Sequence, residues 1–234
     1  MCFSASASFG ASLVLSVIGV ATIKNTQHRA QIPFASIPLV FAVQQLSEGV
    51  LWLTLPNAEY ITTQKVATYF FLFFAQIVWP ILVPISILLL EKRNAIRITQ
   101  KALTGAGLIV GVYLGYCLPS FNVEAKIIEH HIKYSQDYPA AFRNYGIVLY
   151  ALATIAPPFF SHIRRMWMLG AAILISYIIT AIFYEHYILS VWCFFSAILS
   201  VSVYLITLEI KGKYEVNAKF VLLNQNVISG KKND

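Results

Sequence analysis

Long apolar stretches separated by short polar segments make up most of the chain. A helix needs about 20 mainly apolar residues to cross the roughly 30 Å hydrocarbon core of a bilayer. The pattern therefore predicts an all-α protein, a polytopic membrane bundle of about seven transmembrane helices over residues 1–208. The predicted helices are Phe9–Ile23, Pro33–Leu55, Ala67–Leu90, Ala102–Leu118, Tyr145–Phe160, Met166–Tyr184 and Tyr187–Leu208. Residues 209–234 are predicted to form a basic cytoplasmic tail.

The composition supports the membrane class. Hydrophobic residues make up 58% of the chain and charged residues only 12%, whereas soluble domains carry about 25% charged residues. The formal net charge is +7, but the basic residues lie between the apolar runs and form no stripe with interleaved aromatics. We therefore expect membrane lipids, and no nucleic acid, as partners.

Lysine and arginine concentrate in alternate loops, which predicts the orientation of the helices. Short cytoplasmic loops are enriched in basic residues. The first, third and fifth loops and the tail hold Lys24, Arg29, Lys92, Arg93, Arg97, Lys101, Arg164, Arg165, Lys211, Lys213, Lys219, Lys231 and Lys232. With seven spans, this places the N-terminus outside and the C-terminus in the cytoplasm.

Two stripes of small residues predict close helix contacts. Ser4, Ser8, Ser12 and Ser16 recur every fourth residue, as do Gly107, Gly111 and Gly115. Small side chains at this spacing let helix backbones approach one another in a membrane. We expect a tight contact within the chain; the alternative is a homo-oligomer through the Ser8/Ser12/Ser16 or the Gly107/Gly111/Gly115 seam.

Glu48 is the most informative single residue, because an ionisable group inside a span is costly and normally faces a polar interior. Gln44, Glu48 and Trp52 are spaced four residues apart and share one face of the predicted helix. The face lies in the outer half of the span. We therefore predict an outward-facing polar pocket around Glu48.

Other metal-capable groups are predicted at the same side. His130 and His131 belong to the run Ile127–Tyr134, whose apolar spacing predicts a short interfacial helix, and Glu185 and His186 join the last two spans. Carboxylate and imidazole are common ligands of divalent metals. The set that follows is Gln44, Glu48, Trp52, Cys2 and Glu185 as pocket residues, and Glu48, His130, His131 and His186 as metal ligands.

The same residues have a purely structural interpretation. The three histidines of that set would lie at the water interface, and Glu48 would be a protonated packing residue. His28 and His162 fall in predicted cytoplasmic loops among arginines, where a solvated or lipid-facing histidine is expected. The cofactor is left open by the sequence, with a divalent metal such as zinc as the candidate.

The opening Met-Cys-Phe-Ser-Ala-Ser-Ala-Ser-Phe at residues 1–9, followed by Gln-Gln-Leu-Ser-Glu-Gly-Val-Leu-Trp at 44–52, resembles a family of bacterial multi-span membrane proteins of unknown function. Such proteins begin with a Met-Cys-Phe-Ser-Ala segment. The resemblance implies that Cys2, Glu48 and Trp52 belong to a shared pattern, and it implies a multi-pass protein of the bacterial inner membrane. It supplies no substrate.

The sequence is compatible with three functions. The leading hypothesis is a pocket around Glu48 that binds a metal ion or a small ligand. The alternatives are a metal-assisted hydrolase that acts on membrane lipid, in which metal-bound water is the nucleophile, and a proton-linked transporter or sensor. The sequence contains no GxSxG nucleophile motif, and it assigns no catalytic residue.

Overall fold

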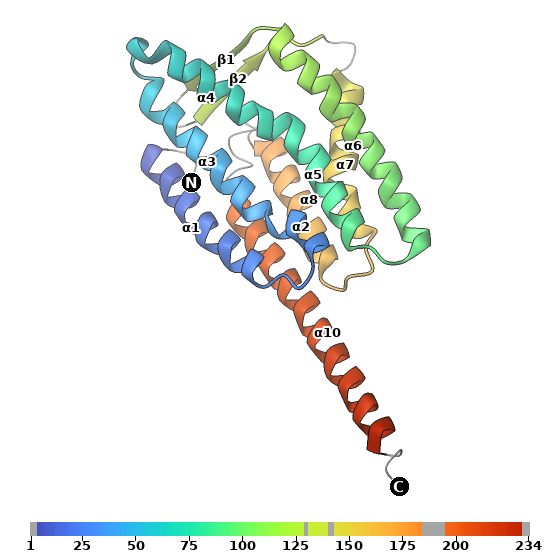
Figure 1. The fold of residues 1–234 in the computed structure, drawn as a ribbon. Coiled ribbons are helices and arrows are strands. Elements are labelled where there is room, and N and C mark those ends of the chain that lie inside the picture. The colour runs from blue at the N-terminus through green and yellow to red at the C-terminus, as the bar shows by residue number, and fades with distance from the viewer. Residues whose placement is uncertain (1–3, 129–130, 140–142, 184–194, 231–234) are drawn as a thin grey trace.

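The computed structural model describes residues 4–128, 131–139, 143–183 and 195–230, and the chain is mostly helical (Figure 1). Its helices are α1 (Ala5–Lys24), η1 (Arg29–Gln31), α2 (Ile32–Ala35), α3 (Ile37–Thr54), η2 (Ala58–Tyr60), α4 (Ile61–Phe73), η3 (Phe74–Val78), α5 (Trp79–Leu90), α6 (Asn94–Ser120), α7 (Arg143–Phe159), α8 (Met166–Phe183) and α10 (Ser196–Gly230). Each of the seven segments predicted to be helical overlaps at least one of these helices, the last of them only in its described part from Ser196 on.

Four helical segments in the described part of the chain are long and apolar enough to cross a membrane. They are Ala5–Lys24, Arg29–Thr54, Ala58–Leu90 and Asn94–Ser120. Gly146–Phe159 and Met166–Thr180 are shorter apolar helices. The predicted class, a helical protein with several segments that are long and apolar enough to cross a membrane, is thus confirmed.

The prediction of a short helix within Ile127–Tyr134 is wrong. Its described residues belong to an antiparallel hairpin of β1 (Val123–Ile128) and β2 (His131–Gln136), with Ile127 opposite Ile132 and Ala125 opposite Tyr134. Side chains along β1 alternate between half-buried and exposed. This period of two is the pattern of a strand with one face on a core, and it corrects the all-α expectation.

The third predicted span is one continuous helical stretch with a wide turn in its middle. The segment Phe74–Val78 is π-helical and lies between α4 and α5. Pro80 follows two residues after Val78, and a proline has no N–H to donate to the carbonyl four residues before it, which here is that of Gln76. The wide turn therefore accompanies a sequence-encoded break in the hydrogen-bond ladder.

The two small-residue stripes make contacts within the chain. Ser12 Oγ donates a hydrogen bond to the Ala42 carbonyl oxygen at 2.8 Å. Gly107 lies so close to the Pro80 carbonyl that a Cβ at this position would overlap its oxygen. The expected packing between helices is seen at both stripes, while the homo-oligomer stays a prediction.

The hairpin and the projecting part of α10 mark opposite ends of the bundle (Figure 1). The hairpin end comprises β1, β2 and the ends of α3, α4 and α6 on which they lie. The basic end comprises the α1–α2, α5–α6 and α7–α8 connections and α10 around residues 209–215. Beyond Leu208 the chain continues as helix to Gly230, so residues 209–230 of the predicted tail extend α10.

Candidate ligand site

An interior cavity lies between α2, α3, η3, α5, α7, α8 and α10. It offers about 60 Å³ to the centre of a water-sized sphere, which is room for a few such groups. Its wall is almost entirely apolar. The lining residues are Phe34, Ile37, Phe41, Gln44, Ala75, Trp79, Val83, Ile87, Tyr150, Thr154, Leu169, Ile173 and Leu199.

Gln44 and Trp79 form one polar contact of this wall. Trp79 Nε1 donates to Gln44 Oε1 at 2.7 Å, and both residues are buried. An indole nitrogen is only a donor, so the Gln44 amide presents its oxygen to Trp79 and keeps two N–H donors for other groups. Phe41 packs on the same indole with ring centroids 4.1 Å apart, which fixes the orientation of Trp79.

Tyr150 and Thr154 form a second polar contact on α7. The Tyr150 hydroxyl donates to the Ala75 carbonyl oxygen at 2.6 Å. Ala75 lies in the π-helical turn, where backbone carbonyls deviate from the regular ladder. Thr154 Oγ1 donates to the Tyr150 carbonyl at 2.8 Å. The helix α3 runs toward the hairpin end and α5 runs away from it (Figure 1). The side of the cavity nearer the hairpin end is therefore formed by Gln44, Ala75 and Tyr150.

Glu48 follows Gln44 by one turn of α3, toward the hairpin end. Its side chain is fully buried, with 0% exposure, and Gln45 and Ser47 beside it are also buried. Trp52, one further turn along, packs on the apolar cluster that contains Leu51 and Phe71 beneath the hairpin. The predicted polar face thus runs from the cavity wall at Gln44 into the bundle interior.

The segment after the hairpin reaches into the same region. The Tyr138 hydroxyl donates to Gln76 Oε1 at 2.9 Å. Burial raises the pKa of Tyr138 to about 12, although the hydrogen bond to Gln76 acts in the opposite direction. Tyr138 is therefore a neutral donor at physiological pH. Gln76 belongs to the π-helical turn, so one turn carries contacts to both Tyr138 and Tyr150.

Several predicted site residues cannot be placed relative to this cavity. Cys2, His130, Glu185 and His186 lie outside the described residues. His131 begins β2 and is half-buried. Within the ranges that the structure describes, no three His, Cys, Asp or Glu side chains are grouped so that they could hold a metal ion. The predicted zinc-type site therefore stays a prediction.

The basic end contains a buried carboxylate, that of Glu91, which the sequence did not predict. His162 Nδ1 lies 2.7 Å from Glu91 Oε1; His162 is exposed, as expected of a loop histidine, but it also pairs with a buried carboxylate, which the sequence did not indicate. Glu91 is only 2% exposed. It also accepts the backbone N–H groups of Lys92 and Arg93 at 3.0 Å each and that of His162 at 3.1 Å.

These contacts set the ionisation of Glu91. Burial acts to raise its pKa, but the hydrogen bonds from the His162 side chain and from the backbone of Arg93 and His162 act together in the other direction. The pKa of Glu91 therefore lies below its ordinary value. The carboxylate is charged and ties α5 to the α7–α8 connection. Nothing in the local Glu-Lys-Arg sequence distinguishes it from a solvated charge.

Sequence reasoning also missed most of the cavity. Trp79 lies on α5, and Tyr150 and Thr154 lie on α7, so these residues share no motif. Of the predicted pocket residues that the structure describes, only Gln44 lines the cavity wall. The available signal was the proline after Trp79, which marks an irregular turn in a span.

The fold and the cavity define a helical protein with several segments long and apolar enough to cross a membrane. A model described as a family of unknown function (DUF6629) matches residues 1–216. The chain belongs to this family. The comparison with curated proteins found no match, nor did the comparison with solved structures.

Proposed function

We propose that this is a membrane-embedded binding protein whose interior cavity holds a small, mainly apolar molecule with one hydrogen-bonding group. The apolar wall supports this, because ligand sites are typically lined by hydrophobic side chains with a few placed polar groups. The polar group of the molecule would lie at the Gln44–Trp79 side, and its apolar part would lie among Val83, Leu169 and Ile173.

The proposed setting is the bacterial inner membrane, crossed by seven helices with the hairpin end outside. The basic end carries Lys92, Arg93, Arg164 and Lys213 among other basic residues, and positive loops favour the cytoplasmic side. A fluorescent protein fused to the C-terminus should therefore fold and fluoresce. Alkaline phosphatase inserted at Lys126, on the hairpin, should be active; the reverse pair of results would overturn this orientation.

The cavity can be tested with 1-hexanol, which is apolar and has one hydroxyl group. A ligand that binds only the folded state raises the unfolding temperature. Ile173 lines the cavity and is 6% exposed, whereas Ile175, also on α8, is 56% exposed. Ile173→Phe fills the cavity, and Ile175→Phe is its matched control. Hexanol should stabilise wild type and Ile175→Phe but not Ile173→Phe; equal shifts in all three would reject the cavity.

The metal-ion form of the hypothesis keeps one specific support, the complete burial of the Glu48 carboxyl. An ionisable group so deep in a membrane-type helical bundle is by default a candidate functional residue. Elemental analysis of the purified full chain distinguishes the metal-site hypothesis from the apolar-ligand hypothesis. If the wild type holds a stoichiometric metal ion and Glu48→Gln does not, the metal-site hypothesis is supported in place of the apolar ligand. Lipid hydrolysis and proton-linked transport would then be assayed next.

A further inference from the structure

A second pocket, separate from the interior cavity, lies at the basic end. Its volume is about 460 Å³, and it is formed by the α1–α2 connection, the end of α5, the α7–α8 connection and α10. Polar and basic side chains from all four elements line it: His28, Gln31, Lys92, His162, Lys213 and Tyr214. Leu89, Leu90 and Ile210 supply an apolar part of the wall.

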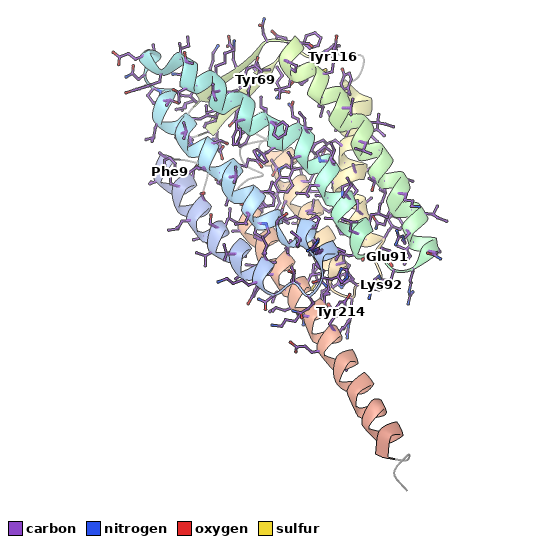
Figure 2. All side chains as sticks on the ribbon, in the orientation of Figure 1. Phe9, Tyr69, Glu91, Lys92, Tyr116 and Tyr214 are labelled. Carbon is purple, nitrogen blue, oxygen red and sulfur yellow. The ribbon has the colours of Figure 1, made fainter. Side chains whose placement is uncertain are left out.

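Lys92 and Tyr214 form one side of this pocket. Lys92 Nζ lies 3.4 Å from the Tyr214 hydroxyl oxygen and 5.0 Å from the centre of its ring. Figure 2 shows the two residues together with Glu91 where α10 leaves the bundle. No carboxylate in the described part of the chain forms an ion pair with Lys92, so its positive charge is not compensated by a direct contact.

Two acidic residues at this end, Glu91 and Glu209, are engaged by other groups, and the third, Glu215, is exposed and lies 4.0 Å from Lys211. Glu91 is directed inward, where His162 and three backbone N–H groups bind its two oxygens. Glu209 lies on α10, and its Oε1 is 2.6 Å from Lys213 Nζ while its Oε2 accepts the Arg165 backbone N–H at 3.2 Å. The pocket therefore keeps an excess of donors, with Lys213 partly compensated by Glu209.

We propose that the pocket at the basic end binds a phosphate group, either on the headgroup of an anionic phospholipid or as free phosphate. Ammonium, imidazole, phenol and amide groups can all donate to phosphate oxygens, and charged donors form the stronger bonds. Lys92 would be the main ligand, supported by Tyr214 and His28. The leucine and isoleucine side chains beside it would contact the first part of an acyl chain.

The test uses the full chain purified in a neutral detergent and binding measured by native mass spectrometry. The probes are dioleoyl phosphatidylglycerol, dioleoyl phosphatidylcholine as the zwitterionic comparison, and inorganic phosphate. Lys92→Gln should weaken binding of phosphatidylglycerol about tenfold, the loss expected for one charge-assisted hydrogen bond. Lys101→Gln is the control, because Lys101 is an exposed basic residue of α6 that does not line the pocket.

A change in the opposite direction sharpens the test. Glu209→Gln removes the charge that compensates Lys213, so it should tighten binding severalfold. Binding of phosphatidylglycerol alone would identify a headgroup site, and binding of inorganic phosphate with the same variant effects would identify a free-phosphate site. Equal weakening by Lys92→Gln and Lys101→Gln, or equal binding of both lipids, would overturn the proposal. None of these binding results depends on the interior cavity, so the function proposed for that cavity is tested separately.

Discussion

The two ends of the bundle are closed by different kinds of interaction. At the hairpin end, Tyr134 stacks on Phe71 with ring centroids 4.7 Å apart and planes 2° from parallel, and Tyr138 donates one neutral hydrogen bond to Gln76. At the basic end, a buried carboxylate, Glu91, holds a side-chain nitrogen and three backbone N–H groups. One end relies on aromatic packing and the other on charge.

Because of this difference, we expect the contribution of the Glu91 contacts at the basic end to stability to depend on pH. Aromatic stacking and neutral hydrogen bonds change little between about pH 4 and pH 9, because no group in them titrates there. A buried carboxylate stabilises only while it is charged and paired. Perturbations of the Glu91 contacts should therefore depend on pH, and those of the Tyr134 and Tyr138 contacts should not.

The largest expected effect comes from Glu91→Ala. Glu91 is buried while its partner His162 is partly exposed, so we expect a loss of about 3 kcal/mol, the lower end for a broken buried ion pair, because the remaining donors lose their acceptor. The free energy of unfolding of the full chain in detergent measures this cost. Glu215→Ala is the control, since Glu215 is exposed and lies 4.0 Å from Lys211; such a surface pair contributes at most about 1 kcal/mol. Similar losses in both variants would contradict the comparison.

Gly107→Ala tests the contact between α5 and α6 that joins the two ends. The added Cβ would overlap the Pro80 carbonyl oxygen, which belongs to the backbone and has little room to move. We expect a loss of about 1–3 kcal/mol, typical of overpacking.

Gly105→Ala is the matched control on the same helix, because nothing lies within 4 Å of a Cβ at Gly105. There the substitution should stabilise by about 0.5–1 kcal/mol, since alanine favours a helix over glycine. Loss of stability in Gly105→Ala as large as in Gly107→Ala would show that the helices do not meet as described.

Tyr138→Phe removes only the hydroxyl that donates to Gln76. The expected loss is about 1 kcal/mol, and it should be the same at about pH 5 and pH 8, because the pKa of Tyr138 is raised to about 12 by burial. Limited proteolysis of the segment after β2 reports the local part of this change. A strong pH dependence of the loss would contradict the neutral character of the Tyr138–Gln76 contact.

The smallest expected effect is the loss of the Glu91 contribution to stability at acidic pH. The pKa of Glu91 is lower in the folded protein than its ordinary value of 4.5, so the unfolded chain binds the proton first. The stabilisation is complete above the unfolded pKa and is lost as the pH falls through the folded one. The difference in unfolding free energy between wild type and Glu91→Gln should therefore shrink from about pH 6 to about pH 3. A constant difference would mean that Glu91 is not paired as a carboxylate.

The helices could be predicted from the sequence because each apolar stretch has the length and uniformity of a helix in a membrane. The hairpin could not, because the alternation in Val123–Ile128 is short and the neighbouring histidines also fit an amphipathic helix. Gln44, which lines the cavity, was singled out in the sequence by its spacing to Glu48. Glu91 was missed because its partner His162 lies 71 residues away, and only the packing of α5 against the α7–α8 connection brings the two together.

The central claim is that the interior cavity carries a small, mainly apolar molecule in the native membrane. Mass spectrometry of organic extracts from the purified full chain tests it most directly. The account predicts a compound present in roughly stoichiometric amount in wild type and in Ile175→Phe, and absent from Ile173→Phe. Extracts with the same composition from all three proteins would contradict it.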